Sequence, residues 1–277
     1  MKESTLAGTP SLVVSPKIRD IRSRIVPNIF ISIAVFIAAL ILAVNPDLFD
    51  RPLTTMINSI VGRSRLFDNL VFSAFAFPTF SGVILLSLVW SSWFDNPDTE
   101  NRSRLLVGTL ASFAAGSISR LLQHLLSTHP RPYYDAAIHF KTPPGLLDQP
   151  FNTWNSFPSD HVTVFSGLAI VIYISRSRFA PAAIILTAVV ELSRTYYGAH
   201  YPSDLLAGAA LASIVVWAAQ TSAPVALGRL GTGWEQRSPS LFYMAAFFIS
   251  YQIATLAADI RWVASMLRAA CASARHF

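Results

Sequence analysis

Six apolar runs, separated by polar connections, limit this chain of 277 residues to very few folds. Several of them reach the roughly 20 apolar residues that an α-helix needs to cross a bilayer. The runs lie near 25–44, 69–93, 104–126, 161–175, 179–193 and 203–220. They are too long and too evenly apolar for barrel strands, and lipid tolerates only helices or closed barrels. The sequence therefore predicts an all-α polytopic membrane protein with a six-transmembrane-helix core.

The composition agrees with a membrane protein. Charged residues make up only 13% of the chain, whereas soluble domains carry roughly a quarter. The net charge of +6 could suit nucleic acid, but the basic residues are scattered between the apolar runs, so we expect no nucleic-acid partner. The one cysteine, Cys271, excludes an intrachain disulfide and a CxxC metal site.

The positions of the apolar runs divide the chain into three parts. Residues 1–24 form a predicted cytoplasmic tail, 25–220 the membrane core, and 221–277 a C-terminal extension with a candidate seventh span near 241–258. Residues 46–67 mix charged and apolar side chains, which predicts an interfacial helix between the first two spans.

Lysine and arginine predict the orientation of the spans, because they are enriched on the cytoplasmic side. With a cytoplasmic N-terminus, the segments on that side are 1–24, 94–104, 176–178 and 221–240. They hold eleven Lys or Arg residues, and the opposite side holds six. We therefore expect the connections 127–160 and 194–203 to face away from the cytoplasm, on the outer face of the membrane.

Three polar clusters fall at this outer face, at one bilayer depth. They are HLLSTHPRP at His124–Pro132, PSDH at Pro158–His161 and SRTYYGAHYPSD at Ser193–Asp204. Ionisable groups at the boundary of a span carry a free-energy cost, so they are functional candidates. We expect the three clusters to form one site.

The residue types in these clusters suit an anion. Arg131 and Arg194 can hold a phosphate or carboxylate through paired donors. Ser159 offers a hydroxyl, and the start of the following helix offers free backbone N–H groups. Together they predict an anion cradle.

Two histidines accompany the cradle. Asp204 follows His200 by four residues and can accept a hydrogen bond from its ring, which leaves the other nitrogen free to attack. His161 can protonate a leaving oxygen. A nucleophile and an acid beside one bound anion are thus predicted.

These clusters resemble the motifs of the phosphatidic acid phosphatase type 2 family, which are K-x6-R-P, P-S-G-H and S-R-x5-H-x3-D. The family consists of integral-membrane lipid phosphatases and includes undecaprenyl-diphosphate phosphatases. The third motif is complete at Ser193–Asp204, the second lies at Pro158–His161, and the first is Arg131-Pro132 with His124 in the lysine position. The resemblance covers about residues 100–215.

The resemblance implies a six-helix core and hydrolysis of phosphate esters without a metal or other cofactor. His200 would be the nucleophile that forms a phosphohistidine, Asp204 would orient it, and His161 would be the general acid. The phosphate would be bound by Arg131, Arg194, Ser159, the backbone N–H of Asp160 and, in the lysine position, His124.

Two positions depart from the family pattern. Asp160 replaces Gly, and a similar FPSDH sequence in some undecaprenyl-diphosphate phosphatases favours that substrate. We expect the Asp160 side chain to point away from phosphate while its N–H still serves. His124 replaces Lys, so this ligand is charged only below near-neutral pH. Arg120, one helical turn deeper on the same face, is an alternative cation.

The predicted function is that of a membrane-bound lipid phosphatase acting on a phosphate or diphosphate headgroup. Undecaprenyl diphosphate is the favoured substrate, followed by phosphatidic acid and phosphatidylglycerophosphate. Two alternatives stay open: a lipid phosphotransferase that uses the same phosphohistidine, and a catalytically impaired lipid-phosphate binder. The expected partners are this lipid substrate and membrane lipids, and no obligate protein partner is inferred.

Overall fold

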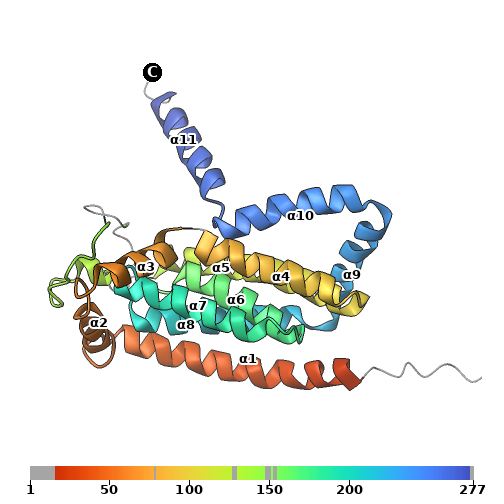
Figure 1. Cartoon of the computed structure of the whole chain (residues 1–277), viewed down its shortest axis with the longest axis horizontal. Helices are drawn as coiled ribbons and strands as arrows, with labels where there is room; N and C mark the ends of the chain where they lie inside the picture. Colours follow the sequence, from red (N-terminus) through yellow and green to blue (C-terminus); the bar gives the residue numbers. More distant parts are fainter. Residues whose placement is uncertain (1–15, 78, 127–129, 147–150, 152–154, 275–277) are drawn as a thin grey trace, which may run out of the picture.

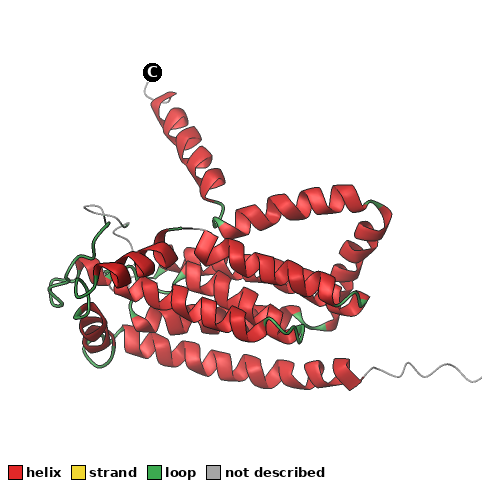
Figure 2. Ribbon diagram, in the orientation of Figure 1, coloured by secondary structure: helices red, strands yellow, loops and turns green. Residues whose placement is uncertain are grey.

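The computed structural model describes residues 16–77, 79–126, 130–146, 151 and 155–274. The regular elements within these ranges are all helical, as Figure 2 shows. A helix occupies each of the six predicted spans, and the helices of these spans run side by side in Figure 1. They are α1 (Pro16–Ala43), α3 (Arg65–Ala76) with α4 (Ile84–Asp95), α5 (Thr99–Leu125), α6 (Asp160–Ile174), α7 (Ala180–Tyr196) and α8 (Pro202–Ala219). The prediction of an all-α polytopic membrane protein is confirmed.

The helices of the bundle differ in length. Among the described helices, α1 from Asp20 onward, α5 and α8 are each long and apolar enough to cross a membrane alone. The shorter helices α4 and α6 are also apolar. At 1.5 Å per residue, the 15 residues of α6 extend over about 22 Å, so this helix spans less than the full hydrocarbon thickness.

The outer surface of α1 has the apolar character of a lipid-facing surface. Phe30, Ile37 and Ile41 are 67%, 52% and 55% exposed. Contiguous apolar surface of this kind is rare on soluble proteins, because water solvates it poorly. In a bilayer, lipid tails cover it at no such cost.

The innermost helix of the bundle is α6. It packs against α4, α5, α7 and α8, and within it only His161, Ile170 and Tyr173 are not buried. A helix that is apolar on all sides belongs in an interior, which explains its even hydrophobicity. His161 stands at the first turn, where this interior helix reaches the end of the bundle.

The second predicted span, 69–93, is divided. The helix α3 ends at Ala76, and a five-residue π-helix, η1 (Thr79–Val83), precedes α4. Pro78, which belongs to this span, lies outside the described residues. Within 46–67, where the sequence predicts an interfacial helix, the structure has the short helix α2 (Asp50–Asn58), after which a turn leads into α3. Its position at the interface stays a prediction.

The C-terminal extension contains three helices. They are α9 (Ser222–Arg237), α10 (Pro239–Ala254) and α11 (Ala258–Ala274). The candidate seventh span corresponds to α10, and the chain then bends by 79° into α11. Leu256 and Ala257 at this bend have positive φ angles of 50° and 54°. In Figure 1, α11 consequently projects away from the bundle.

One end of the bundle collects the predicted clusters. Because α5 and α7 end where α6 and α8 begin, the segments after α5, before α6 and between α7 and α8 lie together. The helices α2 and α3 flank the same end, at the left of Figure 1. The topology therefore brings the three clusters to one place.

Candidate active site

The connection between α7 and α8 presents His200 at the end of the bundle. Gly198 has a φ of +73°, which suits a residue without a Cβ. A Cβ there would also lie 2.7 Å from the ring of Phe140. Glycine thus permits the tight turn that places His200 only six residues after Arg194.

The His200 ring is held through Nδ1. This nitrogen lies 3.0 Å from the carbonyl oxygen of Ser156 and 3.5 Å from Oδ2 of Asp204. A carbonyl oxygen only accepts hydrogen bonds, so Nδ1 carries the proton and Nε2 of the neutral ring carries the lone pair. The ring is 3% exposed, so both its tautomer and its orientation are fixed.

The environment of His200 favours the neutral ring. Burial lowers the pKa of His200 below its ordinary value of 6.5. The hydrogen bond with Asp204 acts in the opposite direction, and the charge of Arg131 lowers the pKa further. The net direction is downward, so the Nε2 lone pair is available at neutral pH.

Arg131 faces Nε2, the unprotonated nitrogen of His200. Its Nη1 donates to the carbonyl of Ala199 at 2.7 Å and lies 3.4 Å from Nε2 of His200. The N–H of Tyr133 donates to the carbonyl of Gly198 at 3.0 Å, which docks this segment on the α7–α8 connection. An anion bound by the Arg131 side chain would therefore be adjacent to Nε2.

Arg194 is a second buried guanidinium, in the last turn of α7. It is 6% exposed, and its guanidinium carbon lies 4.8 Å from the ring centre of Phe75 in α3. Within the described part of the chain, its Nε donates to no acceptor. Buried polar groups are nearly always hydrogen-bonded, so this unsatisfied donor fits a site that takes an anion.

Ser159 caps α6 and links two of the clusters. Its hydroxyl accepts from the N–H of Val162 at 3.5 Å, and its own N–H donates to the carbonyl of Asp204 at 3.2 Å. From α5, Ser119 and Gln123 donate to the carbonyl of Pro158 at 3.0 and 2.6 Å. These bonds fix the start of α6, where N–H groups without intrahelical acceptors face the site.

Asp160 and His161 form a pair. Oδ1 of Asp160 lies 2.9 Å from Nδ1 of His161, and Oδ2 accepts from Nη1 of Arg120 at 2.9 Å. The Asp160 carboxylate is therefore occupied by two side chains. Arg120, considered from the sequence as an alternative phosphate ligand, instead contacts this carboxylate.

His124 differs from the other predicted site residues. It lies in the last turn of α5 with an exposed side chain. Arg131, Arg194, Ser159, Asp160, His200 and Asp204 are all buried. A phosphate-binding role for His124 stays a prediction, and the cation that α5 brings to the buried cluster is Arg120.

A shell of polar contacts supports the α7–α8 connection. The Tyr201 hydroxyl donates to Asp135 at 2.6 Å, and Arg51 of α2 pairs with the same carboxylate at 2.9 Å. Burial alone would raise the pKa of Asp135, but the bonds from Arg51 and Tyr201 hold it below its ordinary value. The N–H of Ser203 donates to Asp50 at 2.9 Å. Thus α2 braces the residues next to His200.

Sequence patterns gave little indication of several of these contacts. The Ser156 contact uses a backbone carbonyl, which no residue type reveals. Phe75 lies in a different helix with no motif around it. Ser119 and Gln123 are polar residues four apart on one face of an apolar helix, a signal that could have identified them.

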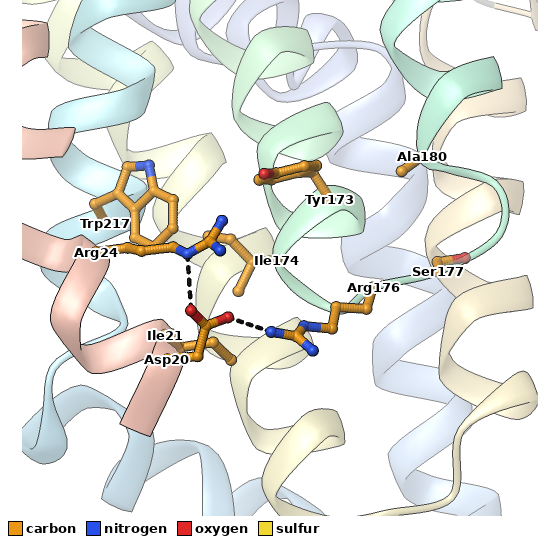
Figure 3. A pocket seen from close by; sticks show the side chains of 9 residues that line it. All are labelled: Asp20, Ile21, Arg24, Tyr173, Ile174, Arg176, Ser177, Ala180 and Trp217. Carbon is orange, nitrogen blue, oxygen red and sulfur yellow. Dashed lines mark hydrogen bonds and ion pairs between the residues drawn. The ribbon is translucent and has the colours of Figure 1, made fainter. Parts of the chain in front are cut away.

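A pocket that contains a group of ion pairs lies at the opposite end of the bundle, where α1 begins and α6 ends. It has a volume of about 310 Å³ and is lined by Asp20, Arg24 and Arg176 among others (Figure 3). Asp20 pairs with both arginines, and the lining contains no histidine or cysteine. Among the described residues, no group of three His, Cys, Asp or Glu side chains is arranged to hold a metal ion. The clustered histidines therefore identify the other end as the candidate active site.

Comparison with known proteins connects this end of the bundle to a family. Residues 104–225 match the family described as the PAP2 superfamily. This range contains all three clusters, and the resemblance predicted from them is confirmed. No solved structure matches the chain significantly.

Three curated relatives are similar to part of the chain. The decaprenylphosphoryl-5-phosphoribose phosphatase of Mycobacterium tuberculosis is 34% identical over 41% of this chain and 58% of its own length. The bacitracin transport permease protein BcrC of Bacillus licheniformis is 30% identical over 44% of this chain and 58% of its own. The undecaprenyl-diphosphatase BcrC of Bacillus subtilis is 24% identical over 53% and 72%. The chain thus covers somewhat more than half the length of the first two relatives.

Proposed function

Because residues 104–225 carry a PAP2 superfamily region, we propose that this protein is a membrane-bound phosphatase that hydrolyses the phosphate group of a polyprenyl or related lipid. One observation carries the proposal. At one end of an apolar bundle, His200 offers a fixed Nε2 lone pair beside the buried Arg131, with a second imidazole, His161, in the same cluster. This is the arrangement of a nucleophile, an anion site and an acid.

In the first step, Nε2 of His200 attacks phosphorus and forms the N–P bond. The bond between phosphorus and the leaving oxygen breaks, and its electron pair stays on that oxygen. His161, protonated on both nitrogens, gives the Nε2 proton to it. Arg131, Arg194, the Ser159 hydroxyl and the Asp160 N–H would stabilise the charge on the other phosphate oxygens.

In the second step, water attacks the phosphohistidine. The now neutral His161 accepts a proton from this water as the new O–P bond forms. The N–P bond breaks, and its electron pair returns to Nε2 of His200. The products are inorganic phosphate and the dephosphorylated lipid, or the monophosphate when the substrate is a diphosphate.

Lipid substrates suit the position of the site. His161 is at the first turn of a helix inside an apolar bundle, so a headgroup can reach the site while its tail stays in lipid. Two of the relatives are named for polyprenyl phosphates, decaprenylphosphoryl-5-phosphoribose and undecaprenyl diphosphate. Undecaprenyl diphosphate is therefore our first choice of substrate, in a bacterial inner membrane with the site on its outer face.

The first test measures phosphate release by purified protein in detergent with EDTA. Undecaprenyl diphosphate, phosphatidic acid and phosphatidylglycerophosphate are supplied in separate reactions. We expect release from at least one of them, and we expect His200→Ala to lower kcat by at least roughly 10³-fold, because the nucleophile is lost.

His139→Asn provides a matched control for the loss of an imidazole. His139 is an exposed loop residue with a φ of 51°, a conformation that Asn tolerates, so we expect full activity. Release of phosphate by His200→Ala at the parent rate would contradict the proposed nucleophile. Loss of the parent activity in EDTA, restored by a divalent metal, would contradict the metal-independent mechanism.

A further inference from the structure

Asp160 is the position at which the second cluster departs from the P-S-G-H pattern, and its carboxylate is fully engaged. Oδ1 accepts from the backbone N–H of His161 and contacts the Nδ1 of the same residue, both at 2.9 Å. Oδ2 accepts from Arg120 at 2.9 Å. The residue is 7% exposed. A buried carboxylate with both oxygens occupied is fixed in position and turned toward protein groups.

The contact with Asp160 defines the protonation of His161. An ionised carboxylate only accepts hydrogen bonds, so Nδ1 of His161 carries a proton. Any proton given to a substrate must then come from Nε2. The ring also stands edge-on to Phe165, with centroids 6.2 Å apart. The imidazole is thus held on two sides, although its side chain remains 34% exposed.

We propose that Asp160 is a positioning residue that holds His161 in the orientation of a general acid, and that Arg120 anchors Asp160 from α5. This inference rests on the proposed phosphatase function and deepens it. A carboxylate paired with the far nitrogen also favours the imidazolium that must exist before proton transfer. Asp at position 160 thus provides a carboxylate that can position His161, whereas the Gly of the family pattern has no side chain to do so.

The charges around His161 show why such a partner matters. Arg194 of α7 and His200 of the α7–α8 connection are the other titratable groups that act on His161. Asp160 is the carboxylate that contacts the His161 ring. Arg120 contacts Asp160 directly, and Arg261 of α11 lies close enough to interact with both Arg120 and Asp160. Removal of the Asp160 charge would leave the His161 ring without its carboxylate partner, beside the guanidinium of Arg194.

The test compares two small phosphate esters, decyl phosphate and p-nitrophenyl phosphate, with the wild-type protein and Asp160→Asn. An alcohol is a poor leaving group and needs the acid, whereas a nitrophenol departs with little help. A general acid contributes roughly 10²- to 10⁴-fold, so we expect Asp160→Asn to lower kcat for decyl phosphate by roughly 10- to 100-fold. We expect kcat for p-nitrophenyl phosphate to stay within about threefold, and KM to change little for both, because the carboxylate does not bind phosphate.

The pH profile gives a second readout that a merely structural role would not move. The alkaline limb of kcat reports the loss of the proton from the acid. Without the Asp160 charge the imidazolium is less stable, so this limb should shift to lower pH in Asp160→Asn. Arg120→Met should produce the same pattern in weaker form, and Arg120→Lys should restore part of the wild-type behaviour.

Asp20→Asn is the matched control. Asp20 also pairs with two cationic side chains, Arg24 and Arg176, at the opposite end of the bundle (Figure 3). We expect wild-type kinetics from this variant. Retained turnover of p-nitrophenyl phosphate shows that Asp160→Asn is folded, and if that variant does not fold, the two Arg120 variants decide the matter.

If Asp160→Asn lowers kcat equally for the two esters, or if the alkaline limb of its kcat profile does not shift, the positioning role is wrong. The phosphatase proposal would remain intact. A rise in KM alone would also overturn it, in favour of a direct contact with phosphate. A wild-type protein that hydrolyses neither these esters nor the lipids would instead remove the proposed function itself, and the inference with it.

Discussion

At the scale of single residues, the site separates two histidines by their partners. His200 bonds to a neutral carbonyl at Ser156, with Asp204 slightly farther away. His161 bonds to the Asp160 carboxylate. A neutral partner suits a ring that must stay uncharged to attack, and an anionic partner suits a ring that must carry a proton. The division of roles proposed for the two histidines follows from these contacts.

The pH dependence should report the state of His200. Attack requires the neutral ring, and burial lowers the pKa of His200 below 6.5. A lowered pKa keeps the ring neutral further into the acid range, so the acid limb of kcat/KM should lie below pH 6.5. Asp204 raises this pKa, so Asp204→Asn should shift the limb to still lower pH. We also expect kcat to fall by roughly 10- to 100-fold, because the orienting charge is lost.

Steady-state kinetics between about pH 4 and 8, a range around the ordinary histidine pKa, would measure both effects. Asn keeps an oxygen that can accept the N–H of Tyr201, as Oδ2 of Asp204 does at 2.8 Å. The cap of α8 should therefore survive the substitution. A limb that moves to higher pH in Asp204→Asn would contradict this account of His200.

At the scale of helices, α5 and α6 pack closely at a glycine in the middle of α6. Gly167 of α6 stands directly against Ser112 of α5. A Cβ at position 167 would lie 2.6 Å from Oγ, 2.7 Å from Cβ and 3.1 Å from Cα of Ser112. Small residues let membrane helices approach closely and gain van der Waals contact. The separation of the two helices therefore depends on the absence of a side chain here.

Gly167→Ala should destabilise the bundle by roughly 1–3 kcal/mol, because the added methyl group overpacks the contact and the Cα of Ser112 cannot rotate away. The midpoint of thermal unfolding in detergent would measure the loss. Gly233→Ala is the matched control, since a Cβ at that position in α9 meets nothing within 4 Å. It should be neutral or stabilise by up to about 1 kcal/mol. Equal melting temperatures for the two variants would contradict the packing argument.

At the scale of the whole molecule, the connections alternate between two ends, and the end with the candidate active site carries fewer basic residues. Asp47 precedes α2 at this end, and Arg178 lies between α6 and α7 at the other. Their side chains are 80% and 73% exposed. The positive-inside rule predicts that Asp47 faces outward and Arg178 the cytoplasm.

Labelling of single cysteines would test this orientation. In a Cys271→Ser background, which removes the one native cysteine, a membrane-impermeant maleimide should label Asp47→Cys in intact spheroplasts. Arg178→Cys should react only after the membrane is permeabilised. The reverse pattern would put the candidate active site on the cytoplasmic side.

The amino-acid sequence alone determines the helices of this protein and the end of the bundle at which its motifs meet. Apolar runs determine the helices, because lipid leaves the backbone no other way to satisfy its hydrogen bonds. The spacing of three motifs determines that His161, His200, Arg131 and Arg194 meet at one end, because alternate spans begin and end there. These inferences depend on local periodicity and on topology, both of which a sequence contains.

Only the tertiary structure decided the contacts within the site. It paired Asp160 with Arg120 and His161, and it gave the nearest contact of His200 Nδ1 to the Ser156 carbonyl instead of Asp204. It also left His124 exposed at the end of α5. Such choices depend on how helices rotate and approach one another, and on backbone groups that every residue shares. The bend between α10 and α11 is likewise not encoded in any hydrophobic run.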